Sequence, residues 1–260
     1  MRLAFSTGSV WTYGLARAFE VARRAGFDAV EVIVDERWDT RQPGYLQRLS
    51  NEHGLEITSL HAPFAPLRGT EGGYQAGVRE ALALADVVGA GTVVVHPESR
   101  GRGYGAWIRQ HWDELQDGHA AGLAVENMPY RRVRTRPRHR THLPEQLVRF
   151  PAVTLDTAHL GTADVDILDG LETVWPRLRH VHLSDYANAP SGQRGAGEEH
   201  LCPGDGELPL MPFLTRLREL DYQGVVVLEL VPEALPVDDE DRLVERVRAL
   251  RQACLAAISP

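Results

Sequence analysis

Residues 92–97 read Thr-Val-Val-Val-His-Pro, a run of β-branched residues followed at once by a histidine. Strands that are covered on both faces read as continuous apolar runs, and this stretch and Gly-Val-Val-Val-Leu-Glu-Leu at 224–230 both do so. The same arrangement, a short apolar run that ends in a histidine or a carboxylate, recurs along the chain. It predicts buried parallel strands with polar groups at their carboxyl ends.

Eight such runs alternate with segments of helical composition, which is typical of successive β–α units around a parallel sheet. Helices are expected over 16–25 and 78–88, because both segments are rich in Ala, Leu and Arg and stop at a glycine, the residue that helix C-caps favour. We expect the strands at 3–7, 29–34, 56–61, 92–96, 123–127, 153–156, 180–184 and 225–230.

Two α/β architectures fit this order, an open doubly wound sheet and a closed barrel. No Gly-x-Gly-x-x-Gly follows the first expected strand, which disfavours a dinucleotide-binding sheet. A length of 260 residues suits one (β/α)8 barrel, which commonly takes about 250. We therefore predict a single TIM barrel domain over residues 1–260.

The polar residues at the strand ends predict a metal centre. Active sites of barrels lie at the carboxyl ends of the strands, so these side chains converge on one rim. A single histidine or carboxylate at a strand end is more often a core or ion-paired residue. Here six successive strands each end in such a residue, which favours the metal-binding interpretation. Imidazole with carboxylate suits Zn, Mn, Fe or Co, and we expect one to three divalent ions per chain. The candidate ligands are His61, His96, Glu126, Asp156, His159, His182, Glu198, His200 and Glu229.

Composition excludes several other classes of protein. All 28 basic residues are arginine, so Schiff-base chemistry and a P-loop nucleotide site, which need a lysine amine, are excluded. Only Cys202 and Cys254 occur, which indicates no disulfide framework. No apolar stretch approaches the roughly 18 residues of a membrane helix, and no signal-peptide core opens the chain. We expect a cytoplasmic protein with no membrane partner.

The chain resembles the xylose isomerase-like barrel superfamily, which includes endonuclease IV and sugar isomerases and epimerases of the tagatose epimerase type. The resemblance rests on Leu-Asp-Thr-Ala-His at 155–159, His-Leu-Ser-Asp at 182–185 and His-x-x-x-Gly-Asp-Gly at 200–206. Residue 198 departs from the endonuclease pattern, being Glu where that enzyme has Asp. The resemblance implies a three-metal site in which His61 and His96 hold one ion, Glu126 and Glu229 bridge or bind others, and the set is completed by Asp156, His159, His182, Glu198 and His200.

The isomerase branch needs only one ion, and its four ligands are nested within the larger set: Glu126, Asp156, His182 and Glu229. For a sugar or sugar-phosphate substrate, Glu126 and Glu229 would move the proton while the ion stabilises an enediolate, and His159 would orient the substrate. Purely ligating roles for the two glutamates are an equal alternative. We favour a metal-dependent isomerase or epimerase acting on such a small molecule.

The alternative is an endonuclease IV-like phosphoesterase with several ions, which His61 and His96 support. Two segments argue against a nucleic-acid substrate. Endonuclease IV has a tyrosine-bearing loop where this chain has Ala-Pro-Phe-Ala-Pro-Leu-Arg-Gly at 62–69, which contains no tyrosine. The Asp-Ser-Lys of that enzyme is replaced here by Ser-Asp-Tyr at 184–186. The net charge of −8 points the same way, so nucleic acid is possible but disfavoured.

An arginine-rich segment follows the expected strand at 123–127. Residues 131–140 read Arg-Arg-Val-Arg-Thr-Arg-Pro-Arg-His-Arg, with six arginines in ten positions. At the catalytic rim Arg131, Arg132 and Arg134 are candidates to bind a substrate phosphate through guanidinium contacts. A solvated surface loop is the competing interpretation. Nothing in the sequence predicts the oligomeric state.

Overall fold

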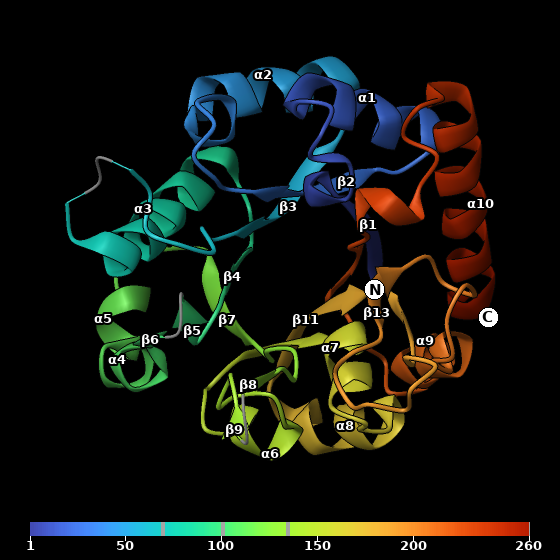
Figure 1. Cartoon of the computed structure of the whole chain (residues 1–260). Coiled ribbons are helices and arrows are strands. Elements are labelled where there is room, and N and C mark those ends of the chain that lie inside the picture. The colour runs from blue at the N-terminus through green and yellow to red at the C-terminus, as the bar shows by residue number, and fades with distance from the viewer. Residues whose placement is uncertain (69–70, 100–101, 134–135, 260) are drawn as a thin grey trace.

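The computed structural model describes residues 1–68, 71–99, 102–133 and 136–259. Eight parallel strands close into a ring with helices around its outside, seen along the barrel in Figure 1. The ring order is β1-β14-β11-β10-β7-β4-β3-β2, and β1 pairs with both β14 and β2. The prediction of a single (β/α)8 barrel is confirmed.

All eight expected strands are present, each within two residues of its predicted bounds. The barrel strands are β1 (Arg2–Ser6), β2 (Ala29–Ile33), β3 (Glu56–His61), β4 (Thr92–Val95), β7 (Gly122–Glu126), β10 (Val153–Asp156), β11 (Leu178–Leu183) and β14 (Val225–Leu228).

The two expected helices also form, and both end where glycine permits a left-handed residue. Gly26 has φ 91° and Gly89 has φ 80°, values that side chains with a Cβ rarely adopt. The helices are α1 (Leu15–Ala25), α2 (Pro43–His53), α3 (Gly73–Val88), α4 (Gly105–Gln110), α5 (Trp112–Gln116), α6 (Pro144–Leu147), α7 (Thr157–Thr162), α8 (Ile167–Val174), α9 (Leu210–Glu219) and α10 (Glu240–Ile258).

Short elements occupy the loops that connect strands to helices. Three antiparallel pairs are formed by β5 (Glu98–Ser99) with β6 (Arg102–Gly103), β8 (Arg132–Val133) with β9 (Arg136–Pro137), and β12 (Asp185–Ala187) with β13 (Glu198–Leu201). The 3-10 turns are η1 (Thr7–Val10), η2 (Asp39–Arg41), η3 (Trp175–Arg177) and η4 (Pro232–Ala234).

The two faces of each strand have different partners, as β10 illustrates. Val153 and Leu155 belong to the large apolar core between barrel and helices. Because side chains alternate along a strand, Thr154 and Asp156 point to the opposite face, into the barrel. The core therefore packs against β10 from outside the barrel, and the inward face of this strand is polar.

Two further expectations concern the cysteines and the membrane. Cys202 and Cys254 are both buried and free. No helix in the described part of the chain is long and apolar enough to cross a membrane.

Candidate metal centre

The strand ends bring eight of the nine predicted ligands together. In each of three groups the ligand atoms lie within 4.8 Å of one another. The groups are His61, His96 and Glu126; Glu126, Asp156, His182 and Glu229; and Asp156, His159 and His200. Glu126 and Asp156 each belong to two groups, so the three are contiguous.

The central group surrounds one nitrogen of His182. Its Nδ1 lies 2.7 Å from Glu126 Oε1, 2.9 Å from Glu229 Oε2 and 3.9 Å from Asp156 Oδ2. These four residues come from the ends of β7, β10, β11 and β14. Three carboxylates therefore face one imidazole nitrogen, which is the donor set of a divalent cation site with nitrogen and oxygen ligands.

The two carboxylate oxygens of Asp156 have different roles: Oδ1 caps a helix, and Oδ2 belongs to the candidate metal site. Oδ1 accepts a 2.7 Å hydrogen bond from the His159 backbone N–H and so caps the first turn of α7. Oδ2 is buried and has no hydrogen-bond partner among the described residues. A buried carboxylate oxygen without a donor is costly, and a cation is the partner that would satisfy it.

A second group adjoins the central one through Glu126. Its Oε2 lies 3.2 Å from His61 Nε2 and 2.8 Å from His96 Nε2. The other nitrogen of His61, Nδ1, is 2.8 Å from the carbonyl of Ala62, which can only accept, so Nδ1 carries the proton in the neutral ring. The unprotonated Nε2 then faces a carboxylate, as expected for a metal ligand.

The third group contains His159 and His200 on either side of Asp156. The Asn127 carbonyl accepts a 2.7 Å hydrogen bond from His159 Nδ1, which leaves Nε2 of that ring as the free ligand atom. His200 Nδ1 lies 3.9 Å from Asp156 Oδ2. His200 has φ 54°, a conformation that is uncommon outside glycine.

The pKa values reflect a crowded, negatively charged interior. Burial raises the pKa of Asp156 to about 7, and Glu126 and Glu229 add to the rise. Burial lowers the pKa of His182, yet Glu229, Glu31 and Glu126 outweigh it and raise that pKa well above its usual value. Burial also lowers the pKa of His159 to about 3, which keeps that imidazole neutral. Without a metal, protons on His182 and Asp156 therefore balance part of the carboxylate charge.

Glu198 lies outside the three groups. It is exposed at the start of β13, whereas its neighbour Glu199 is buried. Glu199 forms an ion pair with Arg131, which also donates to the Gly195 carbonyl at 3.0 Å. The predicted ligand Glu198 is therefore not brought to a ligand group in this structure.

The arginine-rich segment is only partly described. Arg131 is about two-fifths exposed, and its guanidinium is held by Glu199. Arg132 lies in β8, and Arg134 lies outside the described residues. Its role in phosphate binding stays a prediction.

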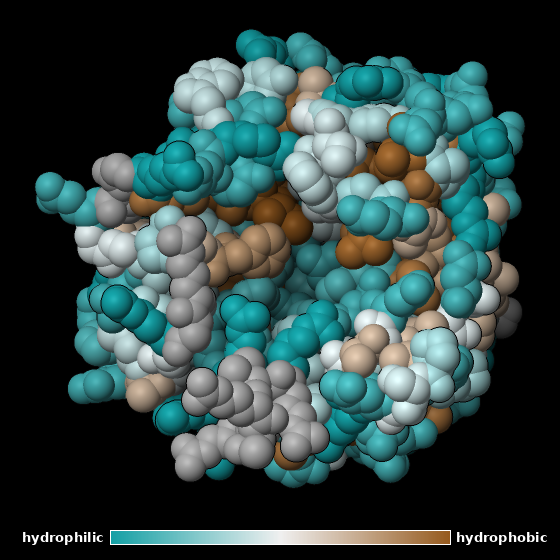
Figure 2. Space-filling model, viewed as in Figure 1, coloured by the Kyte–Doolittle hydropathy of each residue, from teal (hydrophilic) through white to brown (hydrophobic). Residues whose placement is uncertain are grey.

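A cavity of about 380 Å³ opens beside the metal centre. His200 and Glu229 contribute to its lining, together with the apolar side chains of Trp11, Ile33 and Phe64. Figure 2 shows the corresponding hollow in the rim face, with hydrophilic residues in its depth and hydrophobic ones along the upper part of its edge. A small molecule in this cavity would reach Glu229 directly.

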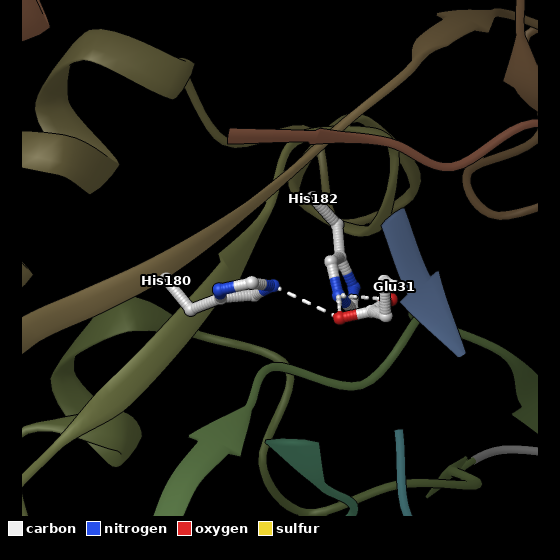
Figure 3. A group of neighbouring side chains, drawn as sticks. All are labelled: Glu31, His180 and His182. Atoms are coloured by element: carbon white, nitrogen blue, oxygen red, sulfur yellow. Dashed lines mark hydrogen bonds and ion pairs between the residues drawn. The ribbon is translucent and has the colours of Figure 1, made fainter. Parts of the chain in front are cut away.

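Sequence reasoning missed two buried residues beneath the centre, Glu31 on β2 and His180 on β11. The two lie with His182 inside the barrel (Figure 3). Burial raises the pKa of Glu31, but His182 and His180 outweigh it and hold that pKa well below its usual value. Two signals were available: Glu31 is the only charge in Ala-Val-Glu-Val-Ile, and His180 is two residues from His182, so the two share a strand face.

A family model described as "Xylose isomerase-like TIM barrel" matches residues 19–253. The chain belongs to this family. An uncharacterized protein of Mycobacterium tuberculosis is 30% identical over 260 aligned residues, covering 88% of this chain and 89% of that protein. The family assignment therefore agrees with the resemblance inferred from the motifs.

Solved structures with the same fold superpose on nearly the whole chain. A 3-keto-D-glucoside 4-epimerase from E. coli matches with a TM-score of 0.71 and 16% identity, covering 97% of this chain and 99% of that one. The IolI protein with a bound zinc atom matches with a TM-score of 0.72 and 17% identity, covering 100% and 98%. At these identities the likeness concerns the fold.

Proposed function

We propose that the protein is a metal-dependent sugar isomerase or epimerase whose ion is held by Glu126, Asp156, His182 and Glu229. One observation carries the proposal: three carboxylates, of which Glu126 and Asp156 are fully buried, converge on Nδ1 of His182, and the Asp156 oxygen among them has no donor among the described residues. The xylose isomerase-like fold and the zinc atom of the IolI structure support it. We expect Zn, Mn, Fe or Co.

The cavity beside the centre suits a small carbohydrate. Trp11 and Phe64 are large apolar side chains that are more than two-fifths exposed, and a sugar ring can pack its C–H face on such surfaces. His200 and Glu229 contribute polar atoms to the same cavity lining, where a bound sugar can contact them. The epimerase of E. coli, which acts on a sugar, has the same fold.

When bound, the ion would polarise the substrate carbonyl and stabilise the negative charge that develops as the neighbouring proton leaves. Glu229 lines the cavity, which supports our proposal that it takes or returns that proton. Its pKa is held at about 2, because the charge and hydrogen bond of His182 outweigh the effect of burial, so it is ionised. Glu126 is the second proposed acid–base group, and His159 would orient the substrate.

The proposal includes a phosphorylated sugar as substrate, and the candidates to bind its phosphate are Arg131, Arg132 and Arg134. Because Arg131 is bound to Glu199, a phosphate would have to displace that carboxylate. A neutral sugar requires no such exchange.

A multinuclear phosphoesterase is the second candidate function, and the two flanking groups favour it. His61 with His96, and His159 with His200, provide ligand sets that a one-ion isomerase does not need. A cluster of ions would supply both a hydroxide and Lewis-acid contacts to a phosphate.

The variants His61→Ala and His96→Ala, assayed on ketoses, sugar phosphates and abasic-site DNA, test the proposal. We expect the central ion to stay bound, with KM raised by roughly tenfold and kcat little changed. Loss of an ion together with loss of phosphoester cleavage by several orders of magnitude would overturn the isomerase proposal in favour of the phosphoesterase.

A further inference from the structure

The interior of this barrel is polar directly beneath the metal centre. Barrel interiors are usually filled by layers of branched apolar side chains. Here Glu31, Ser59, Thr154 and His180 are all fully buried. A buried carboxylate persists only where hydrogen bonds compensate it, so the partners of Glu31 show what it does.

Three donors surround Glu31. Oε2 accepts from Ser59 Oγ at 2.8 Å and from His180 Nε2 at 3.0 Å. His182 Nε2 lies 3.3 Å from Oε1 and 3.4 Å from Oε2, and Figure 3 shows both imidazoles directed at the carboxylate. Ser59 and His180 therefore fix the carboxylate through Oε2, in an orientation that brings both of its oxygens within 3.4 Å of His182 Nε2.

The two nitrogens of His182 therefore face opposite environments. A carboxylate can only accept, so the Nε2 that faces Glu31 carries a proton. In the neutral ring Nδ1 is then unprotonated, and it faces Glu126 at 2.7 Å and Glu229 at 2.9 Å. A nitrogen lone pair directed at two carboxylate oxygens is unfavourable, so Nδ1 must either carry a second ring proton or bind a metal ion that lies between them.

We propose that Glu31 is a positioning residue for the metal ligand His182, fixing the ring in the tautomer that presents Nδ1 to Glu126, Asp156 and Glu229. This inference rests on the proposed metal site and names a residue that touches neither the ion nor the substrate. Carboxylate, imidazole and metal form a line in which the carboxylate orients the ring and raises its basicity. His180 and Ser59 hold the carboxylate in place.

A competing arrangement places an ion among Glu31, His180 and His182 themselves, whose ligand atoms also lie within 4.8 Å. That arrangement needs both Nε2 atoms unprotonated and puts the His182 proton on Nδ1, toward Glu126. The two arrangements therefore predict opposite tautomers of one ring.

The first test measures zinc affinity by chelator competition for wild-type protein and Glu31→Gln, which keeps the side-chain shape but loses the charge. We expect Glu31→Gln to bind zinc about 10–100-fold more weakly. The matched control is Thr154→Val, in the same buried interior, whose hydroxyl has no partner among the described residues; we expect its affinity within about threefold of wild type.

The second test needs no variant: ¹⁵N NMR of zinc-loaded wild-type protein should show His182 protonated at Nε2 and metal-bound at Nδ1. Wild-type protein that binds no zinc would overturn the metal site and this inference together. Wild-type binding with unchanged affinity in Glu31→Gln would overturn this inference alone. Zinc bound at Nε2 of both histidines, and lost in Glu31→Gln, would establish the competing arrangement instead.

Discussion

Glu31 and Glu126 are both fully buried glutamates that contact the imidazole of His182, one from beneath and one from the rim. Around Glu31, three donor groups face one carboxylate: Ser59 and His180 donate to Oε2, and His182 Nε2 lies 3.3 Å from Oε1, which has no hydrogen bond among the described residues. At the rim, Glu126, Asp156 and Glu229 bring three carboxylates to one nitrogen.

The difference shows how a cation site differs from a polar core. One buried carboxylate faced by three donor groups is compensated largely within the protein, whereas three carboxylates around one nitrogen are an excess of acceptors that favours a ligand from outside. The rim is therefore where a metal ion belongs, and the layer below it is where the ligand ring is held.

The largest expected effect comes from neutralising a rim carboxylate. Glu126→Gln and Glu229→Gln should each lower turnover at least about a thousandfold, because an amide neither accepts the proton nor holds the ion equally well. The measurement is kcat on the best substrate, with circular dichroism to show an intact fold. Near wild-type turnover in either variant would remove the proposed mechanism.

Protons should compete with the metal ion for the ligand atoms at the rim. The pKa of Asp156 is raised to about 7 and that of His182 lies well above its usual value, so binding must displace up to two protons below pH 7. We expect zinc affinity to fall by roughly 10–100-fold for each unit that pH drops below 7. Chelator competition at pH 5.5, 6.5 and 7.5 measures this.

Asp156→Asn provides the control for this pH dependence. It removes one titrating ligand, so its affinity should be lower throughout and should change less steeply with pH. An affinity of the wild-type protein that is independent of pH would contradict the charge balance inferred for the rim.

The smallest expected effect is that of Glu198→Gln. Glu198 is exposed and lies outside the three ligand groups, so zinc affinity and turnover should stay within about twofold of wild type. Elemental analysis of the purified variant checks the result. Loss of one metal equivalent would show that β13 moves to complete a third site.

The sequence predicted the fold because alternation and apolar runs are local signals, and eight of them at regular intervals leave few topologies. The rim residues were predictable for a related reason, since His61, Glu126 and Asp156 each end an apolar run and parallel strands end at one rim. Glu31 and His180 were missed because they lie within strands, and their partners come from strands far apart in the sequence. Which of Glu198 and Glu199 turns inward depends on the path of β13, which adjacent residues do not reveal.

The central claim is that one divalent ion sits among Glu126, Asp156, His182 and Glu229. Anomalous diffraction at the zinc edge from zinc-loaded crystals tests it most directly. We predict that the strongest peak lies about 2.0–2.2 Å from one atom of each of the four residues, including Nδ1 of His182. A strongest peak between Glu31 and His180, or no peak at the rim, would contradict the account.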